Sequence, residues 1–271
     1  IDRDKGASIS WISWSDYPKN MVNSKDPGRL IQQSYYAGHR LDRTAEGQSK
    51  NWSPWSWNPI QGGGVSSWAR VIEFQRLNAN TLYGKTIPKL WDMPDEEAEA
   101  LMLQWTGFEP EMPNVVVVRC ELKAKREVND RWGPARLSPQ EIPACYFTRN
   151  FNNMRSYLGD GKWRIENKRP GLPWGKAHPP LNAMAFFEYG GQGIAVFSPT
   201  ATQHWNFGPH GPGLSDDPAE GPCIHVAPID RILLGPESTY SYRYWLVVGT
   251  ETEIADRLDS LLEKYSKEKS T

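Results

Sequence analysis

The chain has 271 residues, a formal net charge of −1 and a mean hydropathy of −0.64. This balance argues against a nucleic-acid partner, because phosphate binding needs a basic excess on some face. No apolar run approaches the roughly 18 residues that cross a bilayer, so no membrane span is predicted. The 13 tryptophans and 11 tyrosines are unusual, and such side chains suit wet, amphipathic surfaces as well as cores. A single domain over residues 1–271 is expected at this length.

The cysteines and the start of the chain give information about the cellular location of the protein. Cys120, Cys145 and Cys223 are widely spaced and form no C-x-x-C pair, so a zinc knuckle is not predicted and at most one internal disulfide can form. Three buried thiols are the simplest interpretation. The chain begins at Ile1, as it would after signal-peptide removal or trimming, and an extracellular or periplasmic location is the expectation.

Short apolar or aromatic runs separated by Gly, Pro, Asn and Asp begin at the N-terminus, and this pattern is typical of β-strands. The run 6–14 alternates and predicts one strand, and the run "GRLIQQSYYAGHR" (28–40) predicts another. Side chains along the second run alternate between two faces. One face carries Arg29, Ile31, Gln33 and Tyr35, and the other carries Leu30, Gln32, Ser34 and Tyr36. Neither face is plainly apolar.

The polar faces of this run favour a binding surface. A buried amide or hydroxyl that lacks a partner costs about 1–3 kcal/mol, so the cluster needs many partners, which a polyhydroxyl ligand would supply. The alternative is that Gln and Tyr side chains bond neighbouring backbone and plug the sheet. With Arg29 before the cluster and His39 after it, we interpret the run as the floor of a sugar-binding cleft.

The next segment, "NWSPWSWNPIQGGG" (51–64), strengthens that interpretation. It combines Trp52, Trp55 and Trp57 with the amides of Asn58 and Gln61. Stacking faces and amide groups together match the apolar face and hydroxyl rim of a pyranose. The alternative is a Trp-lined core wall followed by a Gly-rich turn.

Further along, β-prone runs continue to the last helix. The run 95–103 is ambiguous between helix and strand, and 114–127 predicts a strand that passes from core to solvent. A hairpin is predicted over 182–199, where glycines permit a tight turn. Thr250 and Glu253 form a capping box that opens a C-terminal helix over about 251–266. Three long segments rich in Gly and Pro, typical of functional loops, cover 42–64, 159–180 and 204–222.

Hydrolysis of a glycosidic bond normally uses two carboxylates, about 5–5.5 Å apart for retention. Four carboxylates lie in or beside predicted strands, namely Asp26, Glu73, Glu141 and Glu188. Glu188 follows an apolar run, where a carboxyl group would have a raised pKa suited to an acid. The sequence does not pair any two of them.

Eliminative cleavage of a uronic-acid polymer instead needs a group that neutralises the carboxylate, a base and an acid. A set suited to it is Arg29, Gln33, Tyr35, Tyr36, His39, Tyr146 and His204. His spacing matches no zinc motif, so no metal ligands are assigned, and a structural calcium held by loop oxygens stays open. The chain has no P-loop, dinucleotide fingerprint or nucleophile elbow, so no organic cofactor is expected.

At residues 20–38, 55–64, 141–150 and 185–200 the sequence resembles bacterial carbohydrate-active β-sandwich proteins of the jelly-roll or galactose-mutarotase-like kind, without matching the catalytic motif of one family. The resemblance implies a mainly β fold, a large antiparallel β-sandwich with long Trp-, Gly- and Pro-rich loops and one C-terminal helix. The predicted function is a glycoside hydrolase or polysaccharide lyase acting on a poly- or oligosaccharide. A non-catalytic carbohydrate-binding protein is the first alternative, and a structural domain with a Trp-rich core the second.

The candidate residues divide by role. Candidates for proton transfer are Tyr35, Tyr36, His39 and Glu188. Candidates for substrate binding are Arg29, Gln32, Gln33, Trp55, Trp57, Asn58, Gln61, Tyr146 and His204. Convergence of Gln33, Tyr35 and His39 on one cleft with Trp57 would favour binding, and a closed apolar interior at these positions would oppose it.

Overall fold

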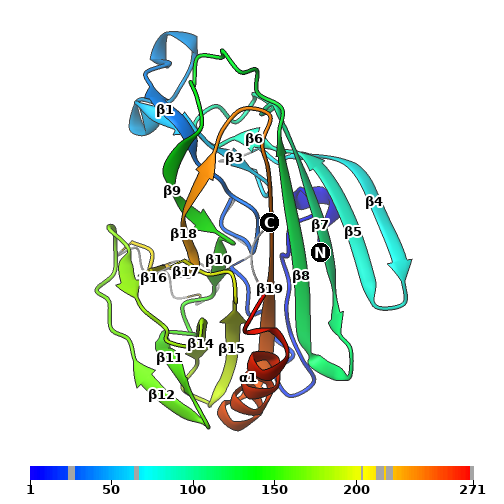
Figure 1. Ribbon diagram of the computed structural model, residues 1–271. Coiled ribbons are helices and arrows are strands. Elements are labelled where there is room, and N and C mark those ends of the chain that lie inside the picture. The colour runs from blue at the N-terminus through cyan, green and yellow to red at the C-terminus, as the bar shows by residue number, and fades with distance from the viewer. Residues whose placement is uncertain (24–27, 64–66, 203, 212–216, 218–221, 269–271) are drawn as a thin grey trace.

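The computed structural model describes residues 1–23, 28–63, 67–202, 204–211, 217 and 222–268 (Figure 1). It is mainly β with one α-helix, α1 (Glu251–Tyr265), and three short 3-10 helices at Arg3–Lys5, Thr44–Glu46 and Lys50–Trp52. The strands in chain order are β1 (Ala37–Leu41), β2 (Trp55–Trp57), β3 (Pro59–Ile60), β4 (Arg70–Asn78), β5 (Thr81–Ile87), β6 (Lys89–Leu90), β7 (Ala100–Glu109), β8 (Met112–Ala124), β9 (Arg136–Ile142), β10 (Cys145–Phe147), β11 (Asn153–Gly159), β12 (Lys162–Ile165), β13 (Gly175–Ala177), β14 (Ala183–Phe187), β15 (Gln192–Phe197), β16 (Trp205–Pro209), β17 (Ile224–Ala227), β18 (Ile229–Leu234) and β19 (Thr239–Thr250).

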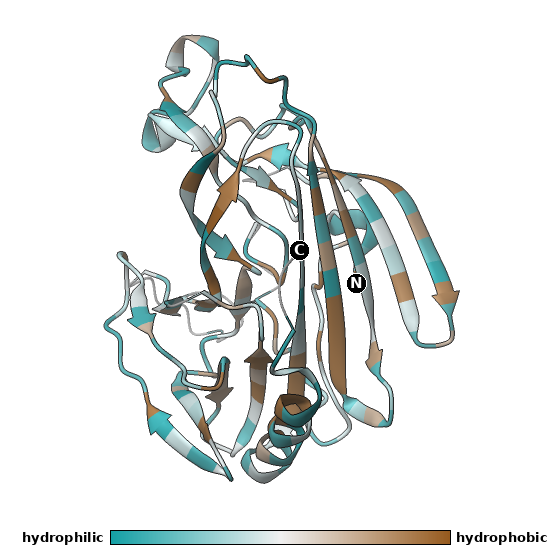
Figure 2. Cartoon of the chain, viewed as in Figure 1, coloured by the Kyte–Doolittle hydropathy of each residue, from teal (hydrophilic) through white to brown (hydrophobic). Residues whose placement is uncertain are grey.

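A nine-stranded antiparallel sheet forms the larger layer, in the order β12-β11-β14-β15-β19-β8-β7-β5-β4. The predicted hairpin lies within it, because β14 pairs with β15 from Ala183 opposite Phe197 to Phe187 opposite Gly193. The middle strand of the sheet is β19, and β8 lies beside it. Figure 2 shows the apolar colour of β8 near the β7–β8 turn, where the Val-rich run 115–118 lies. Further along β8, the buried Cys120, Leu122 and Ala124 alternate with exposed or half-buried residues, so one face of the strand opens to solvent there, as predicted.

A second layer packs across the large sheet and completes a sandwich. It consists of the four-stranded sheet β10-β17-β16-β13 and the pairs β9–β18, β1–β2 and β3–β6. One continuous apolar core joins the layers, and within it the rings of Phe147 on β10 and Phe186 on β14 lie 5.3 Å apart. The predicted antiparallel β-sandwich with a C-terminal helix is confirmed.

The opposite face of the large sheet is covered by α1. Successive residues of β19 alternate between the two faces, so that Tyr244 and Leu246 enter the sandwich core while Trp245 and Val247 pack under the helix. Ile254, Leu258 and Leu261 form the buried side of α1. The helix and its capping box occupy the predicted position, with the Glu253 side chain accepting from the Thr250 backbone N–H at 2.9 Å.

Thr250→Ala is expected to lower the free energy of unfolding by about 1 kcal/mol, because the N-cap hydroxyl that accepts from the Glu253 backbone N–H is lost. Urea unfolding followed by circular dichroism measures this difference. Thr252→Ala, an exposed change in the same helical turn, serves as the matched control. Equal destabilisation by both changes would show that the capping box does not stabilise the helix.

Several local expectations differ from the structure. The run 6–14 forms only isolated bridges, and the run 28–40 becomes a continuous strand only at Ala37, where β1 begins. Before Ala37 there are single bridges, such as Ile31 with Ile9 and Gln32 with Ala144. The helical alternative at 95–103 is wrong, since β7 begins at Ala100. The segments 42–64 and 159–180 contain short strands, β2 and β3 in the first and β12 and β13 in the second.

The structure also tests the predictions about the cysteines and about a membrane span. The three cysteines are buried and free, as the simplest interpretation has it. Among the described residues, no helix is both long and apolar enough to span a bilayer.

Candidate functional site

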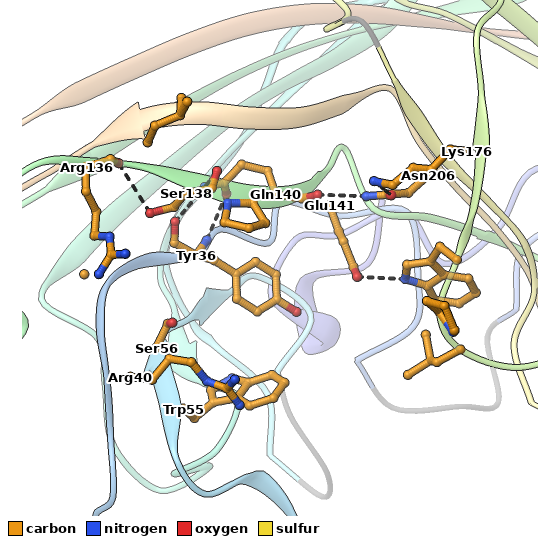
Figure 3. Close-up of a pocket in the computed structure, with 16 residues that line it drawn as sticks. Tyr36, Arg40, Trp55, Ser56, Arg136, Ser138, Gln140, Glu141, Lys176 and Asn206 are labelled. Atoms are coloured by element: carbon orange, nitrogen blue, oxygen red, sulfur yellow. Dashed lines mark hydrogen bonds between the residues drawn. The ribbon is translucent and has the colours of Figure 1, made fainter.

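A cleft of about 740 Å³ opens on the second layer, on the side away from the large sheet (Figure 3). Its walls come from the run that leads into β1, from β2, β9, β13 and β16, and from the loop 172–174. A smaller cavity of about 110 Å³ adjoins it and shares five of its lining residues, Tyr36, Trp55, Glu141, Leu172 and Trp174. These five residues mark the centre of one continuous site, which we call the cleft.

Alternation along the extended run that leads into β1 decides which of its tyrosines reaches the cleft. Tyr36 lines the cleft, whereas the preceding Tyr35 is fully buried in the sandwich core, because consecutive side chains of an extended chain point to opposite faces. In β2, Trp55 lines the cleft, and Trp57, two positions further on, is only 1% exposed. Residues i and i+2 of a regular strand share a face, so alternation does not separate these two tryptophans; the β1–β2 pair is irregular here, with a register shift between Ala37 and Leu41.

Glu141, near the end of β9, is the acidic group of the cleft. Its Oε1 accepts a hydrogen bond of 2.7 Å from the indole N–H of Trp174, and Figure 3 shows the carboxyl pointing toward that ring. Burial raises the pKa of Glu141, while the Trp174 hydrogen bond and the charges of Lys176 and Arg29 act in the opposite direction. A carboxyl group with a raised pKa can give or take a proton closer to neutral pH.

Tyr36 lies beside Glu141 because its backbone is tied to the same strand. The Gln140 side chain accepts from the Tyr36 N–H at 2.9 Å and donates to the Tyr36 carbonyl at 2.6 Å. Burial, and then the charge of Glu141, raises the pKa of the Tyr36 hydroxyl well above 10. This hydroxyl therefore keeps its proton and can donate a hydrogen bond or a proton into the cleft.

Trp174 is held in place by a stack of rings beneath the cleft. His225 lies between Trp174, at 4.2 Å between ring centroids, and Tyr146, at 4.5 Å. Burial lowers the pKa of His225 well below 6.5, so the imidazole in this stack is neutral. The stack fixes the indole N–H that bonds Glu141.

Trp174→Phe is expected to raise the pKa of Glu141 further, because the variant lacks the N–H donor that stabilises the ionised carboxylate. A ¹³C NMR titration of the side-chain carboxyl measures this pKa, and Glu141→Gln assigns the resonance. Trp11→Phe, at an exposed position outside the cleft, is the control. An unchanged titration in Trp174→Phe would contradict the role given to the indole.

The structure brings six of the sequence-predicted residues to the cleft: Arg29, Gln32, Tyr36, Trp55, Asn58 and Tyr146. The Asn58 side chain receives the Trp55 indole N–H at 3.2 Å and donates to the Tyr35 carbonyl at 2.7 Å, so it fixes the Trp55 wall. The guanidinium of Arg29 lies 5.9 Å from the Trp91 ring centroid. These residues form the inner part of the cleft.

Four other predicted residues are in the interior instead: Gln33, Tyr35, Trp57 and Gln61. The Tyr35 hydroxyl donates to the Gln33 side chain at 2.8 Å, and the Gln61 side chain accepts from the Gln33 backbone N–H at 3.0 Å. The protein therefore supplies the partners of these amides, as the sheet-plugging alternative requires. Trp57 packs in the core with the buried Arg126 guanidinium 5.1 Å from its ring.

The remaining three predicted residues, His39, Glu188 and His204, do not line the cleft. His39 is exposed and lies 3.1 Å from an Arg136 nitrogen, while His204 forms a pair with His178 at 3.0 Å. Glu188 follows β14 at the hairpin turn, close to Tyr17, whose pKa is raised by burial and then by the Glu188 charge. The convergence of Gln33, Tyr35, His39 and Trp57 on one cleft, which would have favoured binding there, is thus not observed, and the closed interior at Gln33, Tyr35 and Trp57 opposes binding by these residues.

The other sequence-predicted carboxylates are also accounted for. Glu73 on β4 receives Lys85 at 2.8 Å and lies in the large sheet, and Asp26 lies outside the described residues. Among the described residues, no three His, Cys, Asp or Glu side chains come together as metal ligands. Glu141 is therefore the candidate carboxylate that the fold brings to the cleft.

Sequence reasoning missed Trp174, Lys176, Arg40 and Arg136, which all line the cleft. Trp174 and Lys176 belong to the long segment 159–180, whose length and Gly/Pro content already suggested a functional loop. Lys176 donates to the Asn206 side chain at 2.6 Å and lies 3.5 Å from an oxygen of Asp230. No local pattern marked the two arginines.

No protein-family model and no curated protein matches the chain. Solved structures similar to it include a putative aldose 1-epimerase from Escherichia coli, 12% identical over 91% of this chain and 94% of that one, with a TM-score of 0.49. A galactose mutarotase related enzyme from Lactobacillus acidophilus is 8% identical over 92% of this chain and 93% of that one, with a TM-score of 0.46. Because both TM-scores lie below 0.5, the basis for assigning a function is the cleft itself.

Proposed function

We propose that the protein is a carbohydrate-active enzyme that binds a saccharide in the cleft and transfers protons on it through Glu141. The observation that carries this proposal is the position of the Glu141 carboxyl, with a raised pKa, in an aromatic-walled cleft beside Tyr36. A carboxyl group in such surroundings is a candidate acid or base rather than a surface charge.

The lining of the cleft fits a sugar ring. Tyr36, Trp55 and Trp174 offer aromatic faces, against which the apolar face of a pyranose can stack. Ser56 offers a hydroxyl group for the hydroxyl rim, and the Lys176 ammonium, which donates to the Asn206 amide at 2.6 Å, has further N–H donors. A few polar groups on largely apolar walls are the usual composition of a small-molecule site.

Glu141 and Tyr36 have the protonation states that an acid–base pair needs. The raised pKa of Glu141 makes its ionised form a stronger base than an exposed carboxylate, and the Tyr36 hydroxyl stays protonated. Glu141 can therefore accept a proton from one atom of the substrate while Tyr36 donates a proton to another.

Of hydrolysis and elimination, the lining favours elimination. Hydrolysis normally uses two carboxylates on either side of the scissile bond, and among the described residues Glu141 alone supplies a carboxylate to the lining of the cleft. The nearby Asp230 is buried, and its side chain accepts from the Thr202 hydroxyl at 2.7 Å.

Elimination needs one base and one acid. In this reaction Glu141 takes the proton from a ring carbon next to a carboxylate, and a carbon–carbon double bond forms. The carbon–oxygen bond to the leaving sugar breaks, and the leaving oxygen takes the Tyr36 proton. The protein is thus proposed to be a polysaccharide lyase rather than a glycoside hydrolase.

The test is incubation of the full chain with a panel of neutral and uronic-acid polysaccharides, following reducing ends and the ultraviolet absorbance of unsaturated products. Elimination produces both signals. Reducing ends without the absorbance would mean hydrolysis and would overturn the lyase assignment. Binding without either signal would mean that the protein is a carbohydrate-binding protein, and absence of binding would overturn the proposal as a whole.

A further inference from the structure

The cleft carries more positive than negative charge. Arg40, Arg136 and Lys176 line its larger part, against the single carboxylate of Glu141. In Figure 3, Arg40 and Arg136 lie on one side of Tyr36, and Glu141 and Lys176 lie on the other. The end of the cleft remote from Glu141 is therefore cationic.

The two arginines have no carboxylate partner within ion-pair distance among the described residues. The Nε of Arg40 donates to the Pro54 carbonyl at 3.0 Å, and its guanidinium carbon lies 6.0 Å from the Trp55 ring centroid. One nitrogen of Arg136 lies 3.1 Å from the Nδ1 of His39. Arg40 is thus held by a carbonyl and an aromatic ring and Arg136 by an imidazole, while the other N–H groups of both can bind a ligand.

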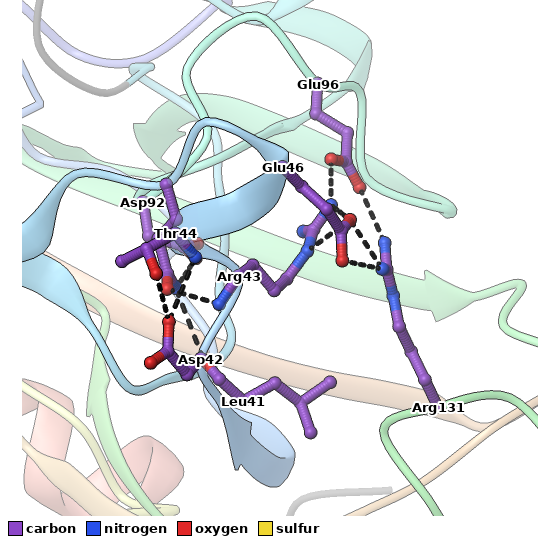
Figure 4. Close-up of polar contacts among 9 residues, drawn as sticks. Leu41, Asp42, Arg43, Thr44, Glu46, Asp92, Glu96 and Arg131 are labelled. Carbon is purple, nitrogen blue, oxygen red and sulfur yellow. Dashed lines mark hydrogen bonds and ion pairs between the residues drawn. The ribbon is translucent and has the colours of Figure 1, made fainter.

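This contrasts with the treatment of arginine elsewhere in the protein. Figure 4 shows Arg43 and Arg131 enclosed by the carboxylates of Glu46 and Glu96, with Arg131 2.7 Å from a Glu46 oxygen. Other arginines also form ion pairs with carboxylates: Arg70, Arg126, Arg155, Arg164 and Arg243. These arginines are neutralised by carboxylates, whereas Arg40 and Arg136 line a cleft and have no such partner among the described residues.

Two guanidinium groups that have unused N–H donors and no carboxylate partner among the described residues favour an anionic ligand. The planar fork of arginine matches the oxygens of a carboxylate, sulfate or phosphate, and such charge-assisted hydrogen bonds are about twice as strong as neutral ones. A neutral sugar would leave the donors of Arg40 and Arg136 unused.

We propose that the saccharide bound in the cleft carries a further oxyanion, besides the carboxylate next to the carbon that Glu141 deprotonates, and that Arg40 and Arg136 bind this group at the end of the cleft opposite Glu141. The inference rests on the proposed function, which places a saccharide in the cleft, and it adds a second anionic group and the site that binds it. Arg40 and Arg136 are binding residues in this account and move no protons.

The test is isothermal titration calorimetry on the full chain with trigalacturonic acid, maltotriose, glucose 6-sulfate and glucose 6-phosphate. We expect at least one anionic probe to bind about 10-fold or more tightly than maltotriose, with the advantage shrinking as salt is raised. The probe that binds best identifies the carboxylate, sulfate or phosphate. Equal affinity for maltotriose and all three anionic probes would overturn the inference.

Arg40→Gln and Arg136→Gln are each expected to weaken the anionic probe about 10-fold and to leave maltotriose unchanged. Arg40→Lys keeps the charge but loses the fork, so an intermediate affinity is expected. Arg76→Gln, at an exposed position on the edge strand β4, makes the same charge change outside the cleft and is the matched control. Loss of anion affinity in Arg76→Gln equal to that in the cleft variants would contradict the site.

Failure of this inference can be separated from failure of the proposed function by repeating the titrations in a Glu141→Gln background. Anion binding that depends on Arg40 and Arg136 in both backgrounds, without turnover of any polysaccharide of the panel by the wild-type chain, supports the anion site and overturns the catalytic proposal. Turnover of a uronic-acid polysaccharide by the wild-type chain with kcat and KM unaffected by the arginine variants supports the proton-transfer chemistry and overturns the anion site.

Discussion

Glu141→Gln is expected to bind the saccharide with nearly wild-type affinity but to turn it over about 100-fold or more slowly. Glutamine keeps the size of the side chain and can still accept the Trp174 indole N–H. It cannot give or take a proton, and general acid–base catalysis contributes typically 10²–10⁴-fold to a rate. Initial rates over a range of substrate concentrations measure the change, which should appear in kcat and leave KM nearly constant.

The same variant has an expected effect on stability that separates catalysis from folding. Because burial raises the pKa of Glu141 above its unfolded value, the folded protein binds this proton more tightly, and stability falls as pH rises above the unfolded pKa. Glu141→Gln does not lose stability in this way. The melting temperature of the variant minus that of the wild type should therefore increase from pH 4 to pH 8. Wild-type turnover in Glu141→Gln, or loss of turnover through unfolding, would contradict the role assigned to this residue.

Trp57→Ala is expected to lower stability and Trp55→Ala to weaken binding, although the two residues are close in the sequence. Trp57 is only 1% exposed in the sandwich core, and replacement of a buried tryptophan by alanine destabilises by about 3–5 kcal/mol. Trp55 lines the cleft and is half-buried, so its removal should weaken saccharide binding about 10-fold while stability changes much less.

Urea unfolding and calorimetric titration of both variants test this contrast. Trp57→Phe provides the control for Trp57, because it keeps an aromatic ring in the core and should recover part of the lost stability. Binding lost in Trp57→Ala without a loss of stability would place the ligand at Trp57 and would contradict the assignment of the cleft to Trp55.

Alternation along the run 28–40 is a local property, and its two faces could be predicted from the sequence. Which face meets the ligand could not, since both faces carry amides and phenols. The structure places Gln33 and Tyr35 inward, where the Gln33 side chain donates to the Leu103 carbonyl of β7 at 3.0 Å. That partner is 70 positions away in the chain, and no local pattern reports it.

The hairpin over 182–199 and the helix α1 were predictable because short-range rules determine them: glycines at a turn and a capping box at an N-terminus. The continuous strand predicted over 6–14 was wrong, and that over 28–40 was right only from Ala37, where β1 begins, because pairing depends on neighbours. Only single bridges form over 6–14 and before Ala37, such as Ser34 with Ile60, even though the residues alternate as a strand would.

The cleft was predictable only in part, for a similar reason. Tyr36 and Trp55 were found because they lie in one aromatic region of the sequence. Trp174 and Arg136 reach the same cleft from the loop before β13 and from the start of β9. Which residues meet in space depends on the order of the strands in the sheet. The sequence could therefore identify Glu141 as a carboxylate in a strand, but it could not identify Trp174 as the donor that bonds it.

In the proposed site a saccharide binds against Trp55 and Trp174. Indole N–H resonances in a ¹H–¹⁵N NMR spectrum, assigned through single Trp→Phe variants and recorded during titration with trigalacturonic acid, report on this contact. We expect the signals of Trp55 and Trp174 to shift with ligand while those of the buried Trp57 and Trp245 stay in place. Shifts confined to tryptophans outside the cleft, such as Trp14 or Trp105, would contradict it.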